Sequence, residues 1–142
     1  MIYKKNRFFV ENFSVESLAK NFATPLYCYS YSKLKENINN FKNSFKLLNP
    51  LVCFSVKSNN NVKILEEIKK QGCGADVVSM GEMLKALKAG INPKKIVFSG
   101  VGKTIEELKF AISKNILLIN VESESELFAK ERIAKLKKKK LK

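Results

Sequence analysis

The sequence predicts an α/β fold in which parallel strands alternate with helices. Four short apolar runs occur at nearly even spacing, and each has the pattern of a strand buried on both faces: residues 51–56, 75–78, 96–98 and 116–121. After three of these runs, a hydroxyl residue is followed three positions later by glutamate, the signature of a capping box at a helix start. Strands that are joined through helices are expected to run parallel.

The predicted helices carry apolar residues at helical spacing. The three capping boxes are Ser79 with Glu82, Thr104 with Glu107, and Ser123 with Glu126. The helix after Ser79 has its apolar positions at Met80, Met83, Leu84 and Leu87. Gly90 and Pro93 favour an end to that helix. The helix after Ser123 is expected to continue into the basic tail, with Leu127, Ile133 and Ala134 on one face.

A further helix is predicted ahead of the first strand. Its apolar residues form one stripe: Leu34, Ile38, Phe41, Phe45 and Leu48. An extended segment, residues 24–29, precedes this helix and contains Pro25. The count is a leading helix and four strand–helix pairs, whereas a closed barrel of eight pairs needs about 250 residues. The fold is therefore either a small open doubly wound sheet or part of a barrel.

Composition limits the class of protein. The chain has 142 residues and is 45% apolar, which is enough for one core. Its cysteines, Cys28, Cys53 and Cys73, are odd in number and lack Cys-x-x-Cys spacing, so we expect buried free thiols and a reducing, cytoplasmic location. Residues 1–7 lead into polar sequence without a long apolar segment, so neither a signal peptide nor a membrane span is expected.

The positive charge is concentrated at the carboxyl end. The net charge is +14, and residues 130–142 hold eight of the 27 basic side chains and one of the 13 acidic ones. The remaining residues have no basic stripe with aromatic interleaving, so nucleic acid is not an expected partner. Repulsion between successive lysines predicts that the last five or six residues fray. The adenine-rich codons of such a lysine run also suggest that the chain ends by frameshift or truncation.

Lys57 is the first candidate for chemistry. It ends the first apolar run and precedes the turn-forming residues 58–61. Burial lowers the pKa of an ammonium group and frees its amine, so a lysine at the end of a buried strand is placed for Schiff-base chemistry. The alternative is a strand-end lysine that reaches into solvent.

Polar residues follow the other predicted strands as well. In parallel α/β folds, ligands bind beyond the carboxyl ends of the strands. Those ends supply Lys57, Asn59, Ser79, Glu82, Ser99, Gly100, Gly102, Lys103, Asn120 and Glu122. Capping alone explains Ser79 and Glu82. Asp76 is different, because it interrupts an apolar strand and needs a partner if it points inward.

Four motifs, in this order, resemble those of the pyridoxal-phosphate decarboxylases of the alanine-racemase-like barrel class. Residues 54–59, Phe-Ser-Val-Lys-Ser-Asn, resemble that family's Tyr-Ala-Val-Lys-Ala-Asn, and residues 74–82 resemble Gly-Ala-Asp-Val-Val-Ser-Gly-Gly-Glu. Residues 98–108 and 120–127 resemble its third-strand and fourth-strand motifs, so the similarity runs from Thr24 to Leu127. Phe54, Ser58 and Met80 depart from the pattern without removing a reactive group.

The resemblance implies a fold, a cofactor and a site. The fold would be the first half of a (β/α)8 TIM barrel that binds pyridoxal 5′-phosphate, with parallel strands and about four βα units after a leading helix. Residues 1–30 would be an amino-terminal extension, 31–136 the partial barrel and 137–142 a basic tail. Lys57 would carry the cofactor, Asp76 would contribute to the cofactor site, and no metal is expected.

The third motif implies a substrate. Phe-Ser-Gly-Val-Gly-Lys-Thr at residues 98–104 resembles the form in diaminopimelate decarboxylases, whereas ornithine and arginine decarboxylases carry an Asn-Pro-Cys-Lys type of sequence there. The implied reaction converts meso-2,6-diaminopimelate into L-lysine and CO2, in a homodimer. The family's ring-stacking histidine, phosphate loop, ring-nitrogen acid and catalytic cysteine come later than residue 142, so this chain is expected to be inactive alone.

Three alternatives remain open. The chain is either part of such a decarboxylase, including one for ornithine, arginine or carboxynorspermidine, or a non-catalytic carrier of pyridoxal phosphate. The third reading is a basic interaction module that uses the lysine tail, which predicts strongly salt-dependent binding to anionic polymers.

Overall fold

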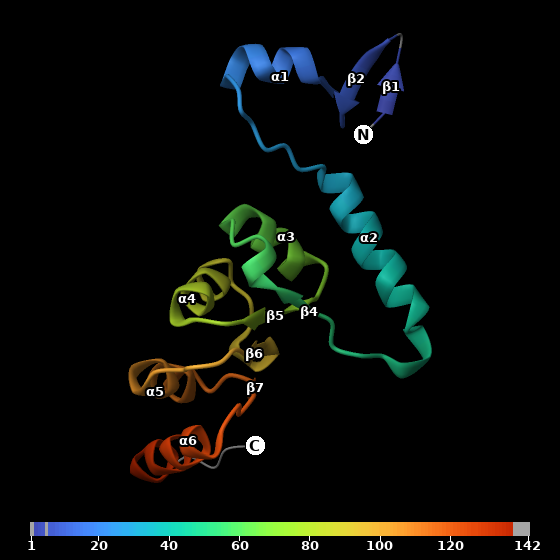
Figure 1. Cartoon of the computed structure of the whole chain (residues 1–142). Helices are drawn as coiled ribbons and strands as arrows, with labels where there is room; N and C mark the ends of the chain where they lie inside the picture. Colours follow the sequence, from blue (N-terminus) through green and yellow to red (C-terminus); the bar gives the residue numbers. More distant parts are fainter. Residues whose placement is uncertain (1, 5, 138–142) are drawn as a thin grey trace. The chain divides into compact units, whose positions relative to one another are not determined.

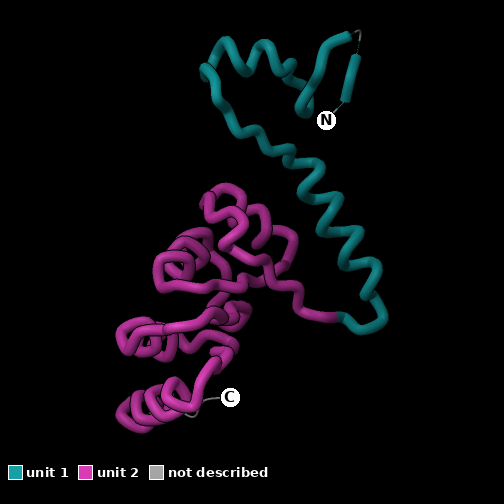
Figure 2. Tube along the Cα trace, viewed as in Figure 1, with its two compact units in different colours: residues 1–49 teal, residues 50–142 magenta. Residues whose placement is uncertain are grey.

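The computed structural model describes residues 2–4 and 6–137, and the chain divides into two compact units. Unit 1 comprises residues 1–49 and unit 2 residues 50–142 (Figure 2). The predicted division at residues 30 and 31 stays a prediction. The fraying expected for the last residues falls on residues 138–142, which lie outside the described part of the chain.

Unit 1 contains elements that the sequence analysis did not predict. Strands β1 (Ile2–Lys4), β2 (Arg7–Val10) and β3 (Phe13–Ser14) form an antiparallel sheet in this order, and helix α1 (Val15–Phe22) follows. Strands of two to four residues are too short to show a clear alternation of apolar and polar residues. The expected extended segment, residues 24–29, contains neither helix nor strand.

The leading helix is present but shorter than its apolar stripe. Helix α2 (Tyr31–Ser44) ends before Phe45 and Leu48, and Leu48 lies in the 3-10 helix η1 (Lys46–Leu48). Asn49 then takes a left-handed conformation. It precedes Pro50, and a proline disfavours the right-handed α conformation in the residue before it. The stripe therefore does not continue as one helix through Leu48.

A carboxylate joins the two parts of unit 1. Glu11 Oε1 accepts hydrogen bonds from Ser30 Oγ at 2.6 Å, from Ser32 N at 2.7 Å and from Ser32 Oγ at 2.8 Å. These bonds, led by that from the Ser30 hydroxyl, lower the pKa of Glu11 below its usual value. Glu11 follows β2, and Ser30 caps α2, so one side chain ties the sheet to the start of the helix.

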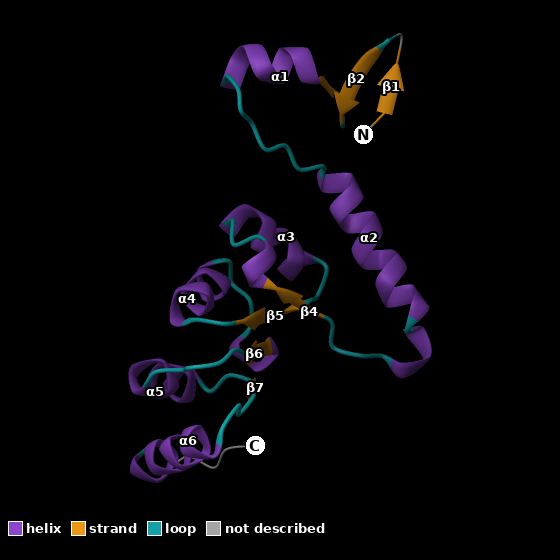
Figure 3. Ribbon diagram, in the orientation of Figure 1, coloured by secondary structure: helices purple, strands orange, loops and turns teal. Residues whose placement is uncertain are grey.

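Unit 2 confirms the predicted alternation of four strands and four helices (Figures 1 and 3). The elements are β4 (Cys53–Ser55), α3 (Val62–Lys70), β5 (Gly74–Val77), α4 (Met80–Lys88), β6 (Ile96–Phe98), α5 (Ile105–Lys114), β7 (Leu118–Ile119) and α6 (Glu124–Leu136), with the 3-10 helices η2 (Val56–Ser58) and η3 (Pro93–Lys95). The strands pair in parallel in the order β4-β5-β6-β7. Figure 1 shows α4, α5 and α6 stacked one after another beside this sheet.

The core of unit 2 lies between the sheet and its helices. The alternate strand residues on this side are fully buried, namely Ala75, Val77, Ile96 and Phe98, and so is Val56 of η2, directly after β4. Leu65 of α3, Met83 of α4 and Leu108 of α5 pack against them and are also fully buried. Burial of a large aliphatic side chain stabilises by about 1.5–3 kcal/mol, so this layer anchors each helix to the strand before it.

The opposite face of the sheet is not buried, which corrects the prediction of strands buried on both sides. This inner face carries Cys53, Ser55, Asp76 and Val97, which are half-buried, and Leu118, which is 40% exposed. Strands with period-two alternation present every second residue to one face. Among the described residues, helices cover one face of the sheet and leave the inner face partly open. Each strand is therefore fully buried on one side only.

Gly74 allows β4, β5 and the η3–β6 junction to approach closely. A Cβ atom placed on Gly74 would lie 2.1 Å from the backbone oxygen of Lys95 and 2.9 Å from Cys53 Sγ. Real Cβ atoms do not approach backbone that closely, so only glycine fits here. The Gly-Ala-Asp motif therefore has a packing reason at its first residue.

The predicted capping boxes are only partly correct. All three hydroxyl residues cap their helices, but only Thr104 and Glu107 form the reciprocal pair. Glu82 accepts instead from Val78 N at 2.9 Å. Glu126 turns away from its own helix start and binds Lys103, which lies on the loop between β6 and α5.

Helix α6 extends into the basic tail, as expected, and buries Ile133 and Ala134. Leu127, which was expected on the same face as Ile133 and Ala134, is 48% exposed. Lys130, the first residue of the basic tail, is buried. None of the helices within residues 2–4 and 6–137 is long and apolar enough to cross a membrane.

Candidate active site

The predicted site residues gather at the carboxyl ends of the four parallel strands. Ser55 and Asp76 are register partners on β4 and β5, and Asp76 is in turn the register partner of Val97 on β6. Ser99 follows β6 directly, and Asn120 follows β7 directly. Because parallel strands end at the same edge of a sheet, these side chains and the lysine after β4 share one rim.

Lys57 lies in the 3-10 turn η2 immediately after β4. Its neighbour Val56 is fully buried against the helices, whereas Lys57 is exposed. No hydrogen bond or ion pair joins the Lys57 amine to another residue in the described part of the chain. The burial that was expected to free the amine is therefore not provided by these residues, and the amine is accessible to a carbonyl compound in solution.

Asp76 has the partners that its place in an apolar strand requires. Its Oδ1 accepts from Ser99 Oγ at 2.6 Å, and its Oδ2 accepts from Ser55 Oγ at 3.2 Å. The two donors belong to the strands on either side of β5. A half-buried carboxylate with two hydroxyl donors avoids the cost of an unpartnered polar group.

A third residue extends this arrangement along the rim. Asn120 Nδ2 donates to Ser99 Oγ at 3.0 Å. The hydrogen bonds thus connect Ser55, Asp76, Ser99 and Asn120, one residue at each of the four strands. We call these four residues the inner-face network. The sequence analysis named Asp76, Ser99 and Asn120 as candidate residues but did not single out Ser55. Ser55 lies two residues after Cys53 in the same strand, and this spacing could have placed both side chains on one face of the sheet.

A buried ion pair, which the sequence analysis missed, joins the loop between β6 and α5 to helix α6. Lys103 Nζ binds Glu126 Oε1 at 2.9 Å, and their side chains are 1% and 7% exposed. The same ammonium donates to Asn120 O at 2.6 Å and to Gly100 O at 2.7 Å. Three acceptors use all three ammonium protons, so Lys103 is occupied structurally and is not a free rim amine.

Lys130 approaches the same cluster from helix α6. Its Nζ is 3.5 Å from Ile119 O, a long contact for a hydrogen bond. Burial lowers the pKa of the Lys130 ammonium, and the nearby Glu126 carboxylate opposes this effect. Neither lysine is therefore equivalent to Lys57.

Glu107 joins two helix starts at the rim. Its Oε2 accepts from Thr104 N at 3.0 Å, and its Oε1 accepts from Met80 N at 2.9 Å. Burial acts to raise the pKa of Glu107, but these backbone hydrogen bonds and that of the Thr104 hydroxyl hold it below the usual value. The sequence identified the capping role of Glu107 but not its bond to the neighbouring helix α4, which lies 27 residues away in the chain.

The cysteines are free thiols, as expected, but only Cys73 is buried. Cys53 lies on the inner face two residues before Ser55. Burial, followed by the nearby Asp76 carboxylate, raises the pKa of the Cys53 thiol. A thiol with a raised pKa is a poor nucleophile, so Cys53 is a weak candidate for covalent chemistry.

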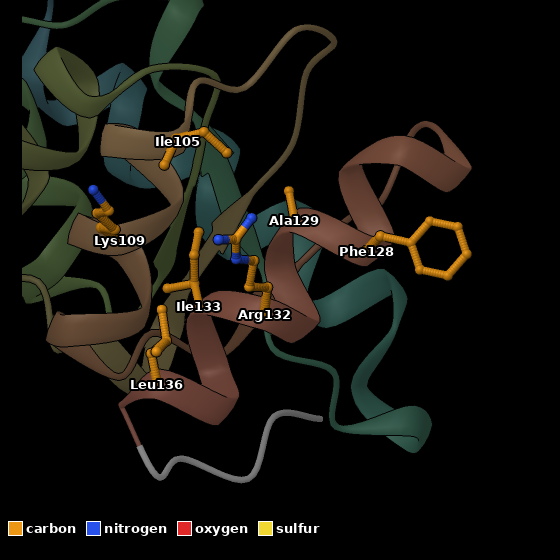
Figure 4. A pocket seen from close by; sticks show the side chains of 7 residues that line it. All are labelled: Ile105, Lys109, Phe128, Ala129, Arg132, Ile133 and Leu136. Atoms are coloured by element: carbon orange, nitrogen blue, oxygen red, sulfur yellow. The ribbon is translucent and has the colours of Figure 1, made fainter.

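An open groove of about 470 Å³ lies between α5 and α6, away from the inner-face network. Figure 4 shows its lining: Ile105, Lys109, Phe128, Ala129, Arg132, Ile133 and Leu136. All seven residues belong to the two helices and none to a strand. The groove therefore takes no part in chemistry at the strand ends.

The sequence motifs imply pyridoxal phosphate, and the described residues fit part of that group. An accessible amine is what its aldehyde requires, and the polar inner face lies beside that amine. Lys57 would hold the aldehyde carbon, and Asp76 would contribute a carboxylate at the same rim. We assign no phosphate ligand to these residues.

Comparison with known proteins shows the family of this chain. Residues 31–141 match the family model described as pyridoxal-dependent decarboxylase, pyridoxal binding domain. The chain belongs to this family. Lys57 and the inner-face network lie within the matched residues 31–141.

Individual relatives point to one branch of the pyridoxal-dependent decarboxylases. Diaminopimelate decarboxylase of Helicobacter pylori J99 is 48% identical over 122 residues, which cover 86% of this chain and 30% of that protein. The Aquifex aeolicus enzyme of the same name is 44% identical over 132 residues, covering 93% and 31%. The crystal structure of M. jannaschii diaminopimelate decarboxylase with L-lysine superposes with a TM-score of 0.92 at 39% identity, covering 95% and 32%.

These comparisons decide the fold. The open doubly wound sheet is excluded, and unit 2 contains the first four βα units of the family's barrel. The chain spans about 30% of the length of the curated relatives that it matches.

Proposed function

We propose that this chain supplies the cofactor lysine and one half of the barrel of a pyridoxal-phosphate-dependent decarboxylase that converts meso-2,6-diaminopimelate into L-lysine and CO2. One observation carries the proposal: the unpaired Lys57 amine stands at the carboxyl end of β4, at the same rim as a carboxylate held by hydrogen bonds across the sheet.

In this mechanism Lys57 would hold the cofactor through its aldehyde carbon. The bound cofactor would supply an electron sink for the pair left when CO2 departs. With substrate in the site, the Lys57 amine would be placed to carry a proton to or from the reacting carbon. Asp76 faces the same rim and would keep this amine oriented toward the cofactor.

The diaminopimelate assignment is supported by the third-strand motif. Ser99, Gly100 and Gly102 form the turn after β6, and both glycines have positive φ, at 92° and 69°. This turn positions Ser99 against Asp76, and its sequence is of the diaminopimelate type. The M. jannaschii relative is crystallised with L-lysine, which is the product of the proposed reaction. A homodimer and a cytoplasmic location are part of the same proposal.

Cofactor attachment is tested by chemical labelling. The chain is mixed with pyridoxal phosphate, reduced with borohydride and mapped by peptide mass spectrometry. We expect one major labelled peptide carrying the modification on Lys57, and loss of that label in Lys57→Ala. Lys85→Ala is the matched control, because Lys85 is an exposed lysine of α4 whose amine donates to Asn60 Oδ1. Undiminished total labelling of Lys57→Ala would refute the assignment.

Turnover is tested in a completed chimera. We define this chimera as residues 1–136 of the chain joined to the part of the H. pylori diaminopimelate decarboxylase that follows the matched segment. It should release CO2 from meso-diaminopimelate and not from ornithine or arginine, and Lys57→Ala should abolish the activity. Cofactor attachment without turnover on any of the three substrates would favour the carrier hypothesis instead.

A further inference from the structure

We propose that Lys103 is a positioning residue for the decarboxylation, because its buried ammonium holds the turn after β6 against the segment after β7. We call residues 99–103 the β6 turn and residues 120–123 the β7 segment. The inference rests on the proposed function and deepens it. The Lys103 side chain is 1% exposed, so it acts on a bound substrate only through the two loops that it holds.

The Lys103 ammonium joins three parts of the chain. It donates to Gly100 O at 2.7 Å in the β6 turn, to Asn120 O at 2.6 Å at the start of the β7 segment, and to Glu126 Oε1 at 2.9 Å on α6. It also lies over the ring of Phe98, 5.5 Å from the ring centroid. One side chain therefore fixes the distance between two loops that follow adjacent strands.

The backbone of the β6 turn has little other support. Its two glycines take positive φ, 92° at Gly100 and 69° at Gly102, and Val101 between them is 83% exposed. Within the described part of the chain, no backbone–backbone hydrogen bond involves residues 100–102. The hydrogen bond from Lys103 to Gly100 O therefore holds this backbone, and its loss would leave the turn free to change shape.

Stability alone does not require a lysine at this place. Burial of an ammonium and a carboxylate costs desolvation energy, and apolar side chains of similar volume often stabilise a protein as well as a buried ion pair does. An apolar side chain cannot, however, donate hydrogen bonds to carbonyl oxygens of two different loops, whereas an ammonium has three protons to donate. The arrangement therefore fits a role in holding the loops.

Both loops lie where a ligand is expected to bind. In parallel α/β folds, ligands bind beyond the carboxyl ends of the strands, against the loops that follow them. The β6 turn and the β7 segment stand at the same rim as Lys57. Because a small displacement of groups that position a substrate can lower the rate by roughly 100-fold, a loose turn should impair turnover even where the cofactor is attached normally.

The test compares two variants of the completed chimera that differ only at residue 103. Glu126→Gln keeps the lysine and provides an amide oxygen that can still accept its third hydrogen bond. The double variant, Lys103→Met with Glu126→Gln, removes the donor and the buried charge together. Because an unpaired buried charge is destabilising, the double variant should be at least as stable in urea as Glu126→Gln. Its kcat/KM for meso-diaminopimelate should nevertheless be roughly 100-fold lower.

Stability and activity separate the two possible roles of Lys103. If the lysine serves only the ion pair, activity follows stability, and the double variant is at least as active as Glu126→Gln. That result would overturn the proposal. Gly100→Ala is a second test that leaves the ion pair intact: its Cβ would lie 3.1 Å from Val78 Cβ at a positive φ, so it should also lower kcat/KM. An unchanged kcat/KM in Gly100→Ala would count against the proposal as well.

A measurement without substrate or cofactor reports on the turn itself. The chain contains no tryptophan, so Val101→Trp places a single indole at an exposed position of the β6 turn in the 142-residue chain. Time-resolved fluorescence anisotropy should show more nanosecond motion of this indole in the double variant than in Glu126→Gln. Equal motion in the two variants would refute the claim that Lys103 holds the turn.

The outcomes distinguish this inference from the proposed function. A chimera without these substitutions that attaches no pyridoxal phosphate at Lys57, or releases no CO2, would refute the proposed function, and the anisotropy would still test the hold of Lys103 on the turn. Borohydride labelling of Lys57 should be the same in Glu126→Gln and in the double variant. A fall in kcat/KM with intact labelling would therefore assign the effect to the two loops, whereas lost labelling would contradict the proposal.

Discussion

Replacing Lys103 by methionine should destabilise the β7–α6 end of unit 2. The substitution keeps most of the side-chain volume but leaves the Glu126 carboxylate, which is 7% exposed, without its ammonium partner at 2.9 Å. Breaking a buried ion pair in this way costs about 3–5 kcal/mol. The ammonium of Lys130 lies near the same carboxylate and offsets part of this cost, so we expect the lower end of the range, about 3 kcal/mol.

Lys130→Met is the matched control. Lys130 is also a buried lysine near Glu126, but its ammonium makes only a long contact, 3.5 Å, to Ile119 O within the described part of the chain. Burial already lowers the pKa of its ammonium, so removing that charge loses little. We expect a change within about 1 kcal/mol of wild type, in either direction.

Local stability is read from amide hydrogen exchange by mass spectrometry, using peptides that span residues 115–130 of the completed chimera. A loss of about 3 kcal/mol in local opening free energy corresponds to roughly 100-fold faster exchange, whereas Lys130→Met should change the rate less than about fivefold. Exchange of Lys103→Met within about threefold of wild type would refute the argument. So would equal effects of the two substitutions.

Two further predictions concern the sheet and the rim. Gly74→Ala should lower the free energy of unfolding in urea by several kcal/mol, because the new Cβ would lie 2.1 Å from Lys95 O. Gly81→Ala in helix α4 is the control: its Cβ would have no contact closer than 3.8 Å, so it should stabilise by about 0.5–1 kcal/mol. Similar effects of the two substitutions would contradict this. Because the folded-state pKa of Glu107 is lowered, its contribution to stability is fully present above the usual pKa of a glutamate side chain and is lost as pH falls through the lower folded-state pKa. Acid unfolding of Glu107→Gln should therefore depend less on pH in that range, and an unchanged slope would argue against the bond to Met80.

The elements of unit 2 were predictable because their signals are local. A helix start needs a hydroxyl and a backbone N–H three residues apart, and Ser79, Thr104 and Ser123 all cap as predicted. Lys57 was found in the same way, from its place after a short apolar run. Its exposure was not predictable, since burial depends on what covers the strand end.

The strands of unit 1 escaped prediction for a related reason. β3 has two residues, and the sheet is stabilised by pairing across turns and by the bonds of Glu11 to Ser30 and Ser32, about 20 residues away. No periodicity in two to four residues reports such contacts.

The sequence by itself determined the order of strands and helices, the motif around Lys57 and the presence of Asp76 within a strand. Only the tertiary structure decided that Asp76 is held by Ser55 and Ser99, that Glu126 leaves its own helix cap for Lys103, and that Lys130 is buried. The physical reason is distance along the chain. Hydrogen bonds within one helical turn leave a pattern in the sequence, whereas bonds between residues more than 20 positions apart exist only after parallel strands bring their ends together.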